Sequence, residues 1–369
     1  MTAFQPVIIP ESVPPGNQGE APKVVESLIR QATNVGASDI HLQAHAKGVT
    51  VSFRFDGVIT PGPELPAEIA DRVFGRIKFL AQLKTYQDSM PQDGRIEARL
   101  VHSPTDIRVA TYPTVTGEKI VLRLFNTGPG KSVEQLGFSN EVASELETFL
   151  REPAGMLLLT GPAGSGKTTT IYACLRALAK SGDRHVITIE DPVEQIIPGV
   201  MQTEVNEARG LDFAKAARHL LRQDPQALII GEIRDEETAN IAVRAALTGH
   251  LVISTLHAGS CNGVLERLLV LCTDHSAVAA SLSLVLNQRL MRKLCTECTG
   301  NGCATCLQTG YQGRVPVVEC LRLTNDSRAR IRANALQAIA PKQTLEESAR
   351  ALIQQGVTNA AEKLRILGL

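Results

Sequence analysis

The sequence MLLLTGPAGSGKT, residues 156–168, decides the fold. Its first five residues form a short apolar run, which is typical of a strand buried on both faces. The last eight fit the phosphate-loop pattern GxxxxGK[ST] at every constrained position, and a helical stretch follows. Glycines let backbone N–H groups turn inward around phosphate oxygens, and the helix directs the positive end of its dipole at the same anion. The alternative, a glycine-rich turn that happens to end in Lys-Thr, does not account for the flanking strand and helix.

The residues of this loop are the candidate nucleotide-binding residues. We expect Lys167 to reach the β- and γ-phosphates and the Thr168 hydroxyl to complete the shell of a Mg²⁺ ion. The full candidate set at this loop is Gly161, Pro162, Ala163, Gly164, Ser165, Gly166, Lys167, Thr168 and Thr169.

Three more apolar runs follow the loop, at residues 186–190, 227–231 and 251–255. Amphipathic stretches separate most of them, so strands and helices alternate. This alternation predicts an α/β fold with a parallel-sheet core flanked by helices. Functional loops are expected at the carboxyl ends of the strands.

Acidic residues and histidines stand at the ends of these runs. Hydrolysis needs a carboxylate that orients or deprotonates a water, and Glu232 is the candidate general base because it ends an apolar strand. Another strand ends in Glu190 and Asp191, which we expect to lie near the metal-bound waters. Glu190 is also a candidate catalytic residue. A strand-end acid is often only the N-cap of the next helix. His257 follows its strand and is a candidate γ-phosphate sensor, whereas His250 precedes that strand and is a weaker candidate.

The chain before the loop has a different character. Residues 1–20 are rich in Pro, Gly and polar residues, which predicts a flexible tail. Residues 21–126 combine two helical stretches with alternating strands, which predicts a smaller α+β domain. We expect this domain to be PAS-like. Residues 127–137 show neither the helical nor the strand periodicity of apolar residues and are assigned as a linker. Residues 138–369 are assigned to the nucleotide domain, with a cysteine-rich insert at 290–315 and a helical C-terminal part.

Composition excludes several classes of protein. The 369 residues carry 38 basic and 38 acidic side chains, 4% aromatic residues and no Trp. This balance and the shortage of stacking side chains argue against direct nucleic-acid binding. The apolar runs are far shorter than the roughly 18 residues of a membrane span, and the N-terminus lacks the pattern of a secretory signal. We therefore expect a cytoplasmic protein.

The cysteines form the second chemical signal. Cys295, Cys298, Cys303 and Cys306 stand in two CxxC pairs and supply the four thiolates of a closed, structural Zn²⁺ site. Redox-active dithiols are the competing interpretation. The run CTECTGNG also has the CxxCxGxG form of zinc-binding chaperone modules, so this motif alone does not identify a family.

The run from ITIEDPVE at residue 187 to the histidine-containing ISTLHA at 253–258 resembles the type II secretion and type IV pilus assembly ATPases. These are RecA-like motors. The pieces ASDIHL, RFDG, PQDGR and DIRVATYPTVTGEKIVLRLF are similar to the second N-terminal domain of that family. The resemblance extends over about residues 21–320.

The resemblance implies a ring, usually a hexamer, with ATP between the two domains. Arg95, Arg108 and Arg123 match positions from which family members direct arginines at the phosphates. Arg314 lies in GYQGR, which follows the zinc site in secretion-type and extension-type members; it joins the candidate nucleotide-binding residues. One departure is the spacer between the CxxC pairs, which is only four residues long.

The resulting expectation is an ATPase motor with ATP, Mg²⁺ and Zn²⁺ that powers assembly of pilins or pseudopilins. The expected partners are an inner-membrane platform protein and a docking protein, which would hold the motor peripherally at the bacterial inner membrane. One alternative is a related ring ATPase for conjugation, competence or DNA translocation. Another is a nucleotide-gated scaffold that barely hydrolyses ATP.

Overall fold

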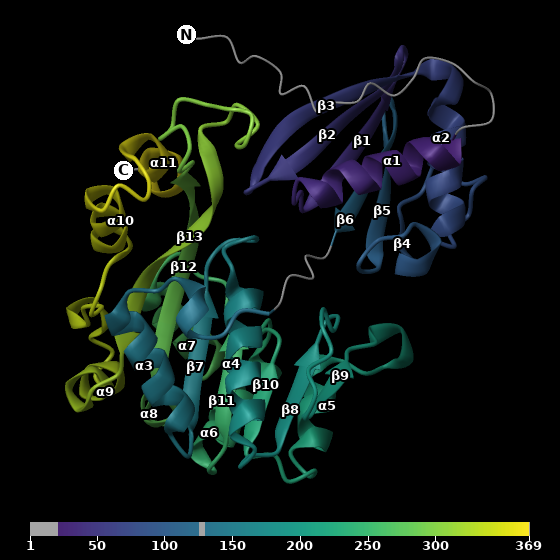
Figure 1. Cartoon of the computed structure of the whole chain (residues 1–369). Coiled ribbons are helices and arrows are strands. Elements are labelled where there is room, and N and C mark those ends of the chain that lie inside the picture. The colour runs from purple at the N-terminus through teal and green to yellow at the C-terminus, as the bar shows by residue number, and fades with distance from the viewer. Residues whose placement is uncertain (1–20, 125–129, 369) are drawn as a thin grey trace. The chain divides into compact units, whose positions relative to one another are not determined.

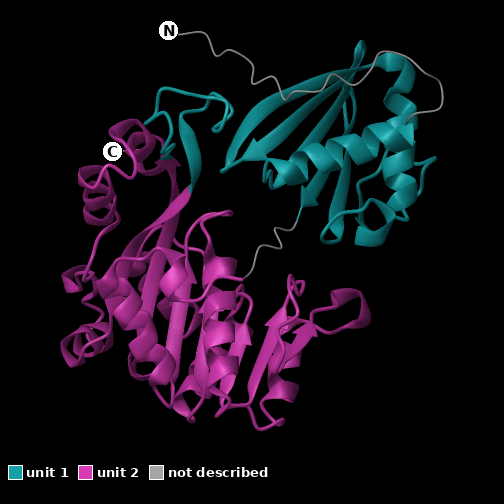
Figure 2. Ribbon diagram, viewed as in Figure 1, with its two compact units in different colours: residues 1–129, 294–313 teal, residues 130–293, 314–369 magenta. Residues whose placement is uncertain are grey.

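The computed structural model describes residues 21–124 and 130–368 (Figure 1). The predicted tail and residues 127–129 of the predicted linker lie outside the described residues. The chain divides into two compact units, residues 1–129 with 294–313, and residues 130–293 with 314–369 (Figure 2). Each unit contains its own sheet.

The first unit is built on an antiparallel sheet with the strand order β3-β2-β1-β6-β5-β4. Its strands are β1 (Asp39–His45), β2 (Gly48–Phe55), β3 (Val58–Pro66), β4 (Gln92–Ile96), β5 (Ile107–Thr114) and β6 (Gly117–Leu124). The helices are α1 (Ala21–Asn34) and α2 (Ala67–Leu80), with a short turn of helix η1 (Ala98–Leu100). This arrangement confirms the α+β expectation.

Alternation along the strands separates the two faces of this sheet. Val49, Val51 and Phe53 of β2 are fully buried, because every second side chain of a strand points to the same face. They pack in one cluster with Leu28 of α1 and Ile77 of α2. The residues between them on β2 are only partly buried, so polar side chains occupy the other face.

The second unit is built on a sheet with the order β13-β12-β7-β11-β10-β8-β9. Its strands are β7 (Gly155–Thr160), β8 (Val186–Glu190), β9 (Val200–Glu204), β10 (Ala227–Ile230), β11 (Leu251–Thr255), β12 (Leu282–Leu294) and β13 (Tyr311–Arg322). Strands β12, β7, β11, β10, β8 and β9 pair in parallel. The four predicted apolar runs form β7, β8, β10 and β11.

Helices flank this sheet (Figure 1). They are α3 (Asn140–Arg151), α4 (Lys167–Ser181), α5 (Phe213–Leu220), α6 (Glu236–Leu247), α7 (Cys261–Leu271), α8 (His275–Ser281), α9 (Asn325–Arg332), α10 (Leu345–Gln354) and α11 (Ala360–Leu367). Short helical turns are η2 (Glu134–Leu136), η3 (Glu207–Arg209) and η4 (Leu336–Ala338).

Two hydrophobic clusters cover the two faces of the sheet, which explains why β7 is a continuous apolar run. Met156 and Leu158 belong to the cluster that includes residues of α5 to α8. Leu157 and Leu159 belong to the cluster that includes residues of α3 and α4. Both faces of β7 are therefore buried, as in other parallel sheets, and its carboxyl end opens directly into the phosphate loop.

Candidate nucleotide site and candidate metal centre

The phosphate loop connects β7 to α4, which begins at Lys167. Two of its glycines are required by the geometry. A Cβ atom at Gly161 would lie 2.3 Å from the carbonyl oxygen of Gln288. Gly166 is the N-cap of α4 with a left-handed φ of 94°, which residues with a side chain rarely adopt. The loop therefore lies close to the neighbouring backbone and presents the amino end of a 15-residue helix.

Two side chains of the loop have features that suit a bound phosphate. The Lys167 ammonium donates hydrogen bonds to the carbonyls of Gly161 at 2.7 Å and Pro162 at 3.0 Å. Burial lowers the pKa of Lys167, the positive charge of Arg289 lowers it further, and Glu232 opposes both effects. The buried hydroxyl oxygen of Ser165 has no hydrogen-bond partner among the described residues. Phosphate oxygens would supply partners for both groups.

A cavity of about 190 Å³ lies beside the loop and brings together six of the predicted residues, namely Lys167, Thr168, Glu190, Asp191, Glu232 and His257. It is lined by Lys167, Thr168, Ile171, Tyr172, Glu190, Asp191, Pro192, Glu194, Phe213, Ile229, Gly231, Glu232, Thr255 and His257. These side chains come from β8, β10 and β11 and the loops that follow these strands, from α4 and from the start of α5. Such convergence follows from parallel pairing, which places all these strand ends at one edge.

Glu232 follows β10 and is held by two basic side chains. It forms an ion pair with Arg234, and one of its carboxylate oxygens lies 3.5 Å from Nε2 of His257. Arg234 also lies 3.8 Å from Asp191 and stacks over the ring of Phe213 at 5.9 Å. Arg234 was not among the residues predicted from the sequence. Arg234 follows Glu232 by two residues, but this spacing indicates a site residue only when the conformation of the segment after β10 is known.

Glu190 is buried and already surrounded by donors. Its carboxylate accepts hydrogen bonds from the hydroxyl of Tyr172, from Thr188 at 2.6 Å and from Gln202 at 2.9 Å. The hydroxyl of Tyr172 also accepts hydrogen bonds from the backbone N–H groups of Glu194 and Gln195. Burial and the hydrogen bond to Glu190 raise the pKa of Tyr172. Glu190 and Tyr172 thus connect β8, helix α4 and the loop that carries Asp191.

His250 lies at the other end of β11. Its Nδ1 atom is 2.9 Å from the carbonyl oxygen of Ala245 and 3.3 Å from the hydroxyl of Thr248. A residue that precedes a parallel strand lies at the amino edge of the sheet, whereas the phosphate loop lies at the carboxyl edge. Within the second unit the structure therefore does not bring His250 to the loop.

The three predicted N-terminal arginines lie in one row across the sheet of the first unit. Arg95 pairs in register with Arg108, Arg108 with Arg123, Arg123 with Asp39, and Asp39 with Arg54. Directly paired residues of adjacent strands share a face, so this row forms a basic stripe.

Carboxylates hold part of the stripe. Arg95 contacts Asp106 at 2.6 Å, and Arg123 contacts Asp39 at 3.1 Å. Arg314, the remaining predicted arginine, is an exposed residue of β13 in the second unit.

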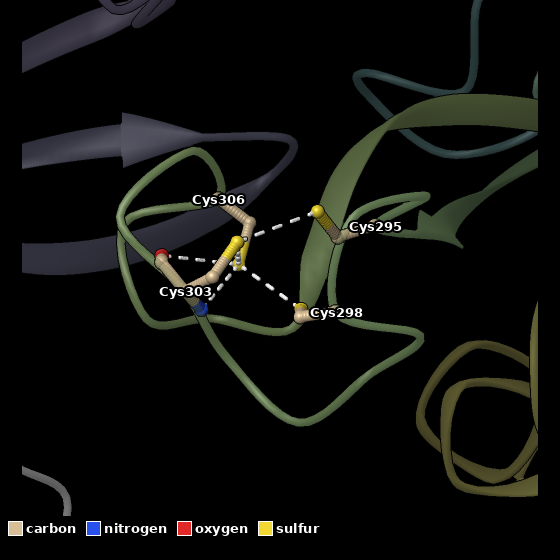
Figure 3. A group of neighbouring side chains, drawn as sticks. All are labelled: Cys295, Cys298, Cys303 and Cys306. Carbon is tan, nitrogen blue, oxygen red and sulfur yellow. Dashed lines mark hydrogen bonds between the residues drawn. The ribbon is translucent and has the colours of Figure 1, made fainter.

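Four cysteine sulfurs gather in the segment between β12 and β13 (Figure 3). The Sγ atoms of Cys295 and Cys303 are 3.8 Å apart, those of Cys298 and Cys306 are 3.7 Å apart, and those of Cys303 and Cys306 are 3.7 Å apart. A tetrahedral zinc site with Zn–S bonds of about 2.3 Å requires sulfurs about 3.8 Å apart. The arrangement therefore fits one zinc ion and is far wider than a disulfide of about 2.05 Å.

Backbone donors support thiolates in this cluster. The N–H groups of Gly302, Cys303 and Gly310 each donate to a cysteine sulfur at 3.2 Å. Burial raises the pKa of Cys306, but hydrogen bonds from Cys303 and Gly310 outweigh burial and lower it to about 7. Since metals bind the thiolate, the segment is chemically suited to hold an ion.

None of the helices within residues 21–124 and 130–368 combines the length and apolar character that a membrane span requires.

A mostly parallel sheet, a phosphate loop after its β7 strand and a carboxylate after β10 define a RecA-like P-loop ATPase. A family described as "Type II/IV secretion system protein" matches residues 16–366, and the chain belongs to this family. The predicted family, fold class and ATPase activity are thereby confirmed.

Individual relatives agree with this membership. The chain is 37% identical over 361 residues to the putative type II secretion system protein E of Escherichia coli (strain K12), covering 91% of this chain and 73% of the relative. It is 40% identical to the type II secretion system protein HxcR of Pseudomonas aeruginosa, covering 93% and 76%. It is 38% identical to the type IV pilus assembly ATPase TfpB of Acinetobacter baylyi, covering 96% and 67%.

Solved structures agree on the fold. The pilus retraction motor PilT with bound ADP superposes with a TM-score of 0.68 at 28% identity, covering 92% of this chain and 96% of PilT. The Legionella pneumophila ATPase DotB superposes with a TM-score of 0.74, covering 98% and 99%, and at 20% identity this likeness concerns the fold alone.

Proposed function

We propose that the protein is a hexameric, Mg²⁺-dependent ATPase that powers the assembly of pilins or pseudopilins in a type IV pilus or type II secretion system. The observation that carries this proposal is the cavity that joins Lys167, Thr168, Glu232 and His257. Family membership supplies the biological setting, since relatives are named for type II secretion and for type IV pilus assembly.

The proposed site assigns a role to each group. The phosphate loop and Lys167 bind the phosphate chain, and Thr168 helps to hold Mg²⁺, with Asp191 near the waters of the ion. Glu232 acts as the general base that takes a proton from the attacking water. His257 contacts the γ-phosphate. Glu190 has its oxygens committed to Tyr172, Thr188 and Gln202, so we assign it a positioning role.

The arginines of the first unit are proposed to complete the site. A guanidinium stabilises the charge that develops on the transferring phosphoryl group. The stripe of Arg95, Arg108 and Arg123 offers such groups on one face of the sheet. If they reach the nucleotide only when the two domains close, closure and hydrolysis are coupled, as a motor requires.

The cysteine cluster is proposed to hold one structural Zn²⁺. Four protein ligands leave no open position for a substrate, which argues for a stabilising role. In this proposal the motor is a cytoplasmic protein held at the bacterial inner membrane by a platform protein and a docking protein. It makes no direct contact with nucleic acid.

Measuring ATP hydrolysis by a Glu232→Gln variant tests the central role in this proposal. General base catalysis contributes about 10²- to 10⁴-fold, so we expect the turnover number to fall at least 100-fold while ATP binding persists. Glu236→Gln is the matched control, because Glu236 is an exposed carboxylate four residues away that does not line the cavity. A turnover number in Glu232→Gln equal to that of the wild type would refute the assignment of Glu232 as the general base. Strong, salt-sensitive stimulation of the wild type by DNA would instead favour a DNA-translocating motor.

A further inference from the structure

Strand β12 runs past the end of β7 and alongside the phosphate loop. Asn287 of β12 pairs with Thr160, the last residue of β7, so the next residues of β12 lie beside the loop. A Cβ atom at Gly161 would be 2.3 Å from the carbonyl oxygen of Gln288 and 3.2 Å from Nη1 of Arg289. The side chain of Arg289, which no sequence motif marks, therefore lies directly against the loop.

The hydrogen bonds of Arg289 all go to neutral acceptors. Its Nη1 donates to Oδ1 of Asn287 at 2.6 Å and to the carbonyl of Gln288 at 2.9 Å, and its Nη2 donates to the carbonyl of Gly259 at 3.3 Å. Across residues 21–124 and 130–368 no carboxylate forms an ion pair with it, in contrast to Arg95 and Arg234. The guanidinium charge is thus partly buried and not neutralised by direct contact.

Arg289 also connects two loops of the proposed nucleotide site. Gly259, whose carbonyl it contacts, lies two residues after His257. The same segment is fixed to the end of β7, because Thr160 and Ala258 exchange two hydrogen bonds of 2.9 Å. The guanidinium therefore lies between the start of the phosphate loop and the loop that carries His257.

The positive charges at the phosphate loop favour binding of a polyanion. Lys167 and Arg289 are two cations at one loop, and each repels the other. Burial lowers the pKa of Arg289, although the negative charge of Glu319 opposes this effect. The positive charge of Arg289 contributes to the lowered pKa of Lys167. A bound phosphate chain would relieve both effects, since an opposite charge in a partly buried site favours the charged form of each base.

We propose that Arg289 is a second phosphate-binding cation of the nucleotide site, which contacts the terminal phosphate of ATP from the same chain as Lys167. The proposal rests on the proposed function, because it requires ATP in the phosphate loop. It is carried by the position of the guanidinium between Gly161 and Gly259 and by the neutral acceptors that it contacts directly, since no carboxylate of the described residues forms an ion pair with it. Such a contact would distinguish ATP from ADP, because ADP lacks the terminal phosphate.

Nucleotide affinities of an Arg289→Gln variant test the proposal. A charge-assisted hydrogen bond that is lost in a partly buried site weakens binding about 10- to 100-fold. We expect this loss for a non-hydrolysable ATP analogue, measured by competition with a fluorescent nucleotide in the presence of Mg²⁺. The affinity for ADP should change less than about threefold, and this retained binding also shows that the variant has folded. Arg289→Lys should recover part of the lost affinity.

A Thr160→Val variant distinguishes phosphate binding from bracing of the loop. Thr160 exchanges two hydrogen bonds of 2.9 Å with Ala258 and so braces the same segment, but it carries no charge and holds none of the hydrogen bonds of Arg289. If Thr160→Val reproduces the selective loss for the ATP analogue, Arg289 acts by bracing the loop and the proposal is wrong. Equal changes for the ATP analogue and ADP in Arg289→Gln, or no change, overturn it as well. Failure of the wild type to bind nucleotide, or undiminished binding by Lys167→Ala, would instead contradict the proposed function.

Discussion

Replacing Glu362 with glutamine should release helix α11 from the sheet. The Glu362 side chain is fully buried and accepts hydrogen bonds from the backbone N–H of Arg292 at 2.8 Å and from its guanidinium at 3.1 and 2.8 Å. The guanidinium of Arg365 donates as well. This carboxylate is therefore the link between β12 and the last helix of the chain.

The magnitude follows from the acidity of this carboxyl. Burial alone would raise the pKa of Glu362, but hydrogen bonds from Arg365 and Arg292 outweigh burial and lower it from 4.5 to about 2. At about 1.4 kcal/mol for each tenfold change, this difference corresponds to about 3 kcal/mol of stabilisation. Because the folded-state pKa is the lower one, the stabilisation is complete above about pH 4.5 and is lost as the pH falls toward 2.

Hydrogen exchange of the α11 amides, followed by mass spectrometry, measures this effect locally. At pH 7 we expect exchange in residues 360–367 to be about 100-fold faster in Glu362→Gln than in the wild type, since 3 kcal/mol corresponds to about two powers of ten. At pH 3 the same linkage leaves about a tenfold difference. The difference between the proteins must therefore shrink as the solution becomes more acidic.

Glu346→Gln provides the matched control. Glu346 pairs with Arg350 and Lys363 on the same helical C-terminal part, but its side chain is 44% exposed, and exposed ion pairs contribute little. We expect its exchange pattern to match that of the wild type. Equal exchange in Glu362→Gln and the wild type at pH 7, or a difference that does not depend on pH, would refute the reasoning.

Three further predictions concern other parts of the molecule. Lys78→Met should destabilise the first unit by about 3–5 kcal/mol in thermal or urea unfolding, because it leaves Glu118 buried without its 2.8 Å partner. Adding Glu118→Leu should recover most of this loss of stability, and failure to recover it would show that the pair acts in another way. Tyr172→Phe removes the hydroxyl bound to Glu190, so steady-state kinetics should give a turnover number about tenfold lower with an unchanged Kd for ATP; a change in Kd alone would count against positioning. Cys303→Ser should reduce the zinc content from one ion per chain to well below one by metal analysis, and wild-type protein without zinc would exclude the assignment.

The sequence was sufficient to predict the core of the nucleotide domain. The runs that became β7, β8, β10 and β11 are short, apolar and buried on both faces, so their pattern has one simple interpretation. The loop glycines and the strand-end acids are equally direct signals, because each lies next to the strand that positions it. Local chemistry and local structure coincide in these segments.

The sequence was not sufficient where function depends on register between distant segments. Asn287 and Gln288 interrupt the apolar pattern of β12, yet both are almost fully buried. Burial is possible because the side-chain amide of Asn287 donates to the carbonyl of Gly259 and that of Gln288 donates to the hydroxyl of Thr170. Neither Arg234 nor Arg289 belongs to a motif that marks it as part of a site. Their positions follow from which strand ends lie side by side, and spacing along the chain does not contain that information.

The cysteine segment has a practical consequence for engineering. It leaves β12 at Leu294 and returns at Tyr311 of β13, two adjacent strands of the sheet. A hydrogen bond of 2.9 Å from the N–H of Cys295 to the carbonyl of Gly310 closes its base. Since both ends of the segment meet there, it can be exchanged as a cassette for a plain turn, for the insert of a relative or for a fluorescent reporter, without changing the sheet beneath it.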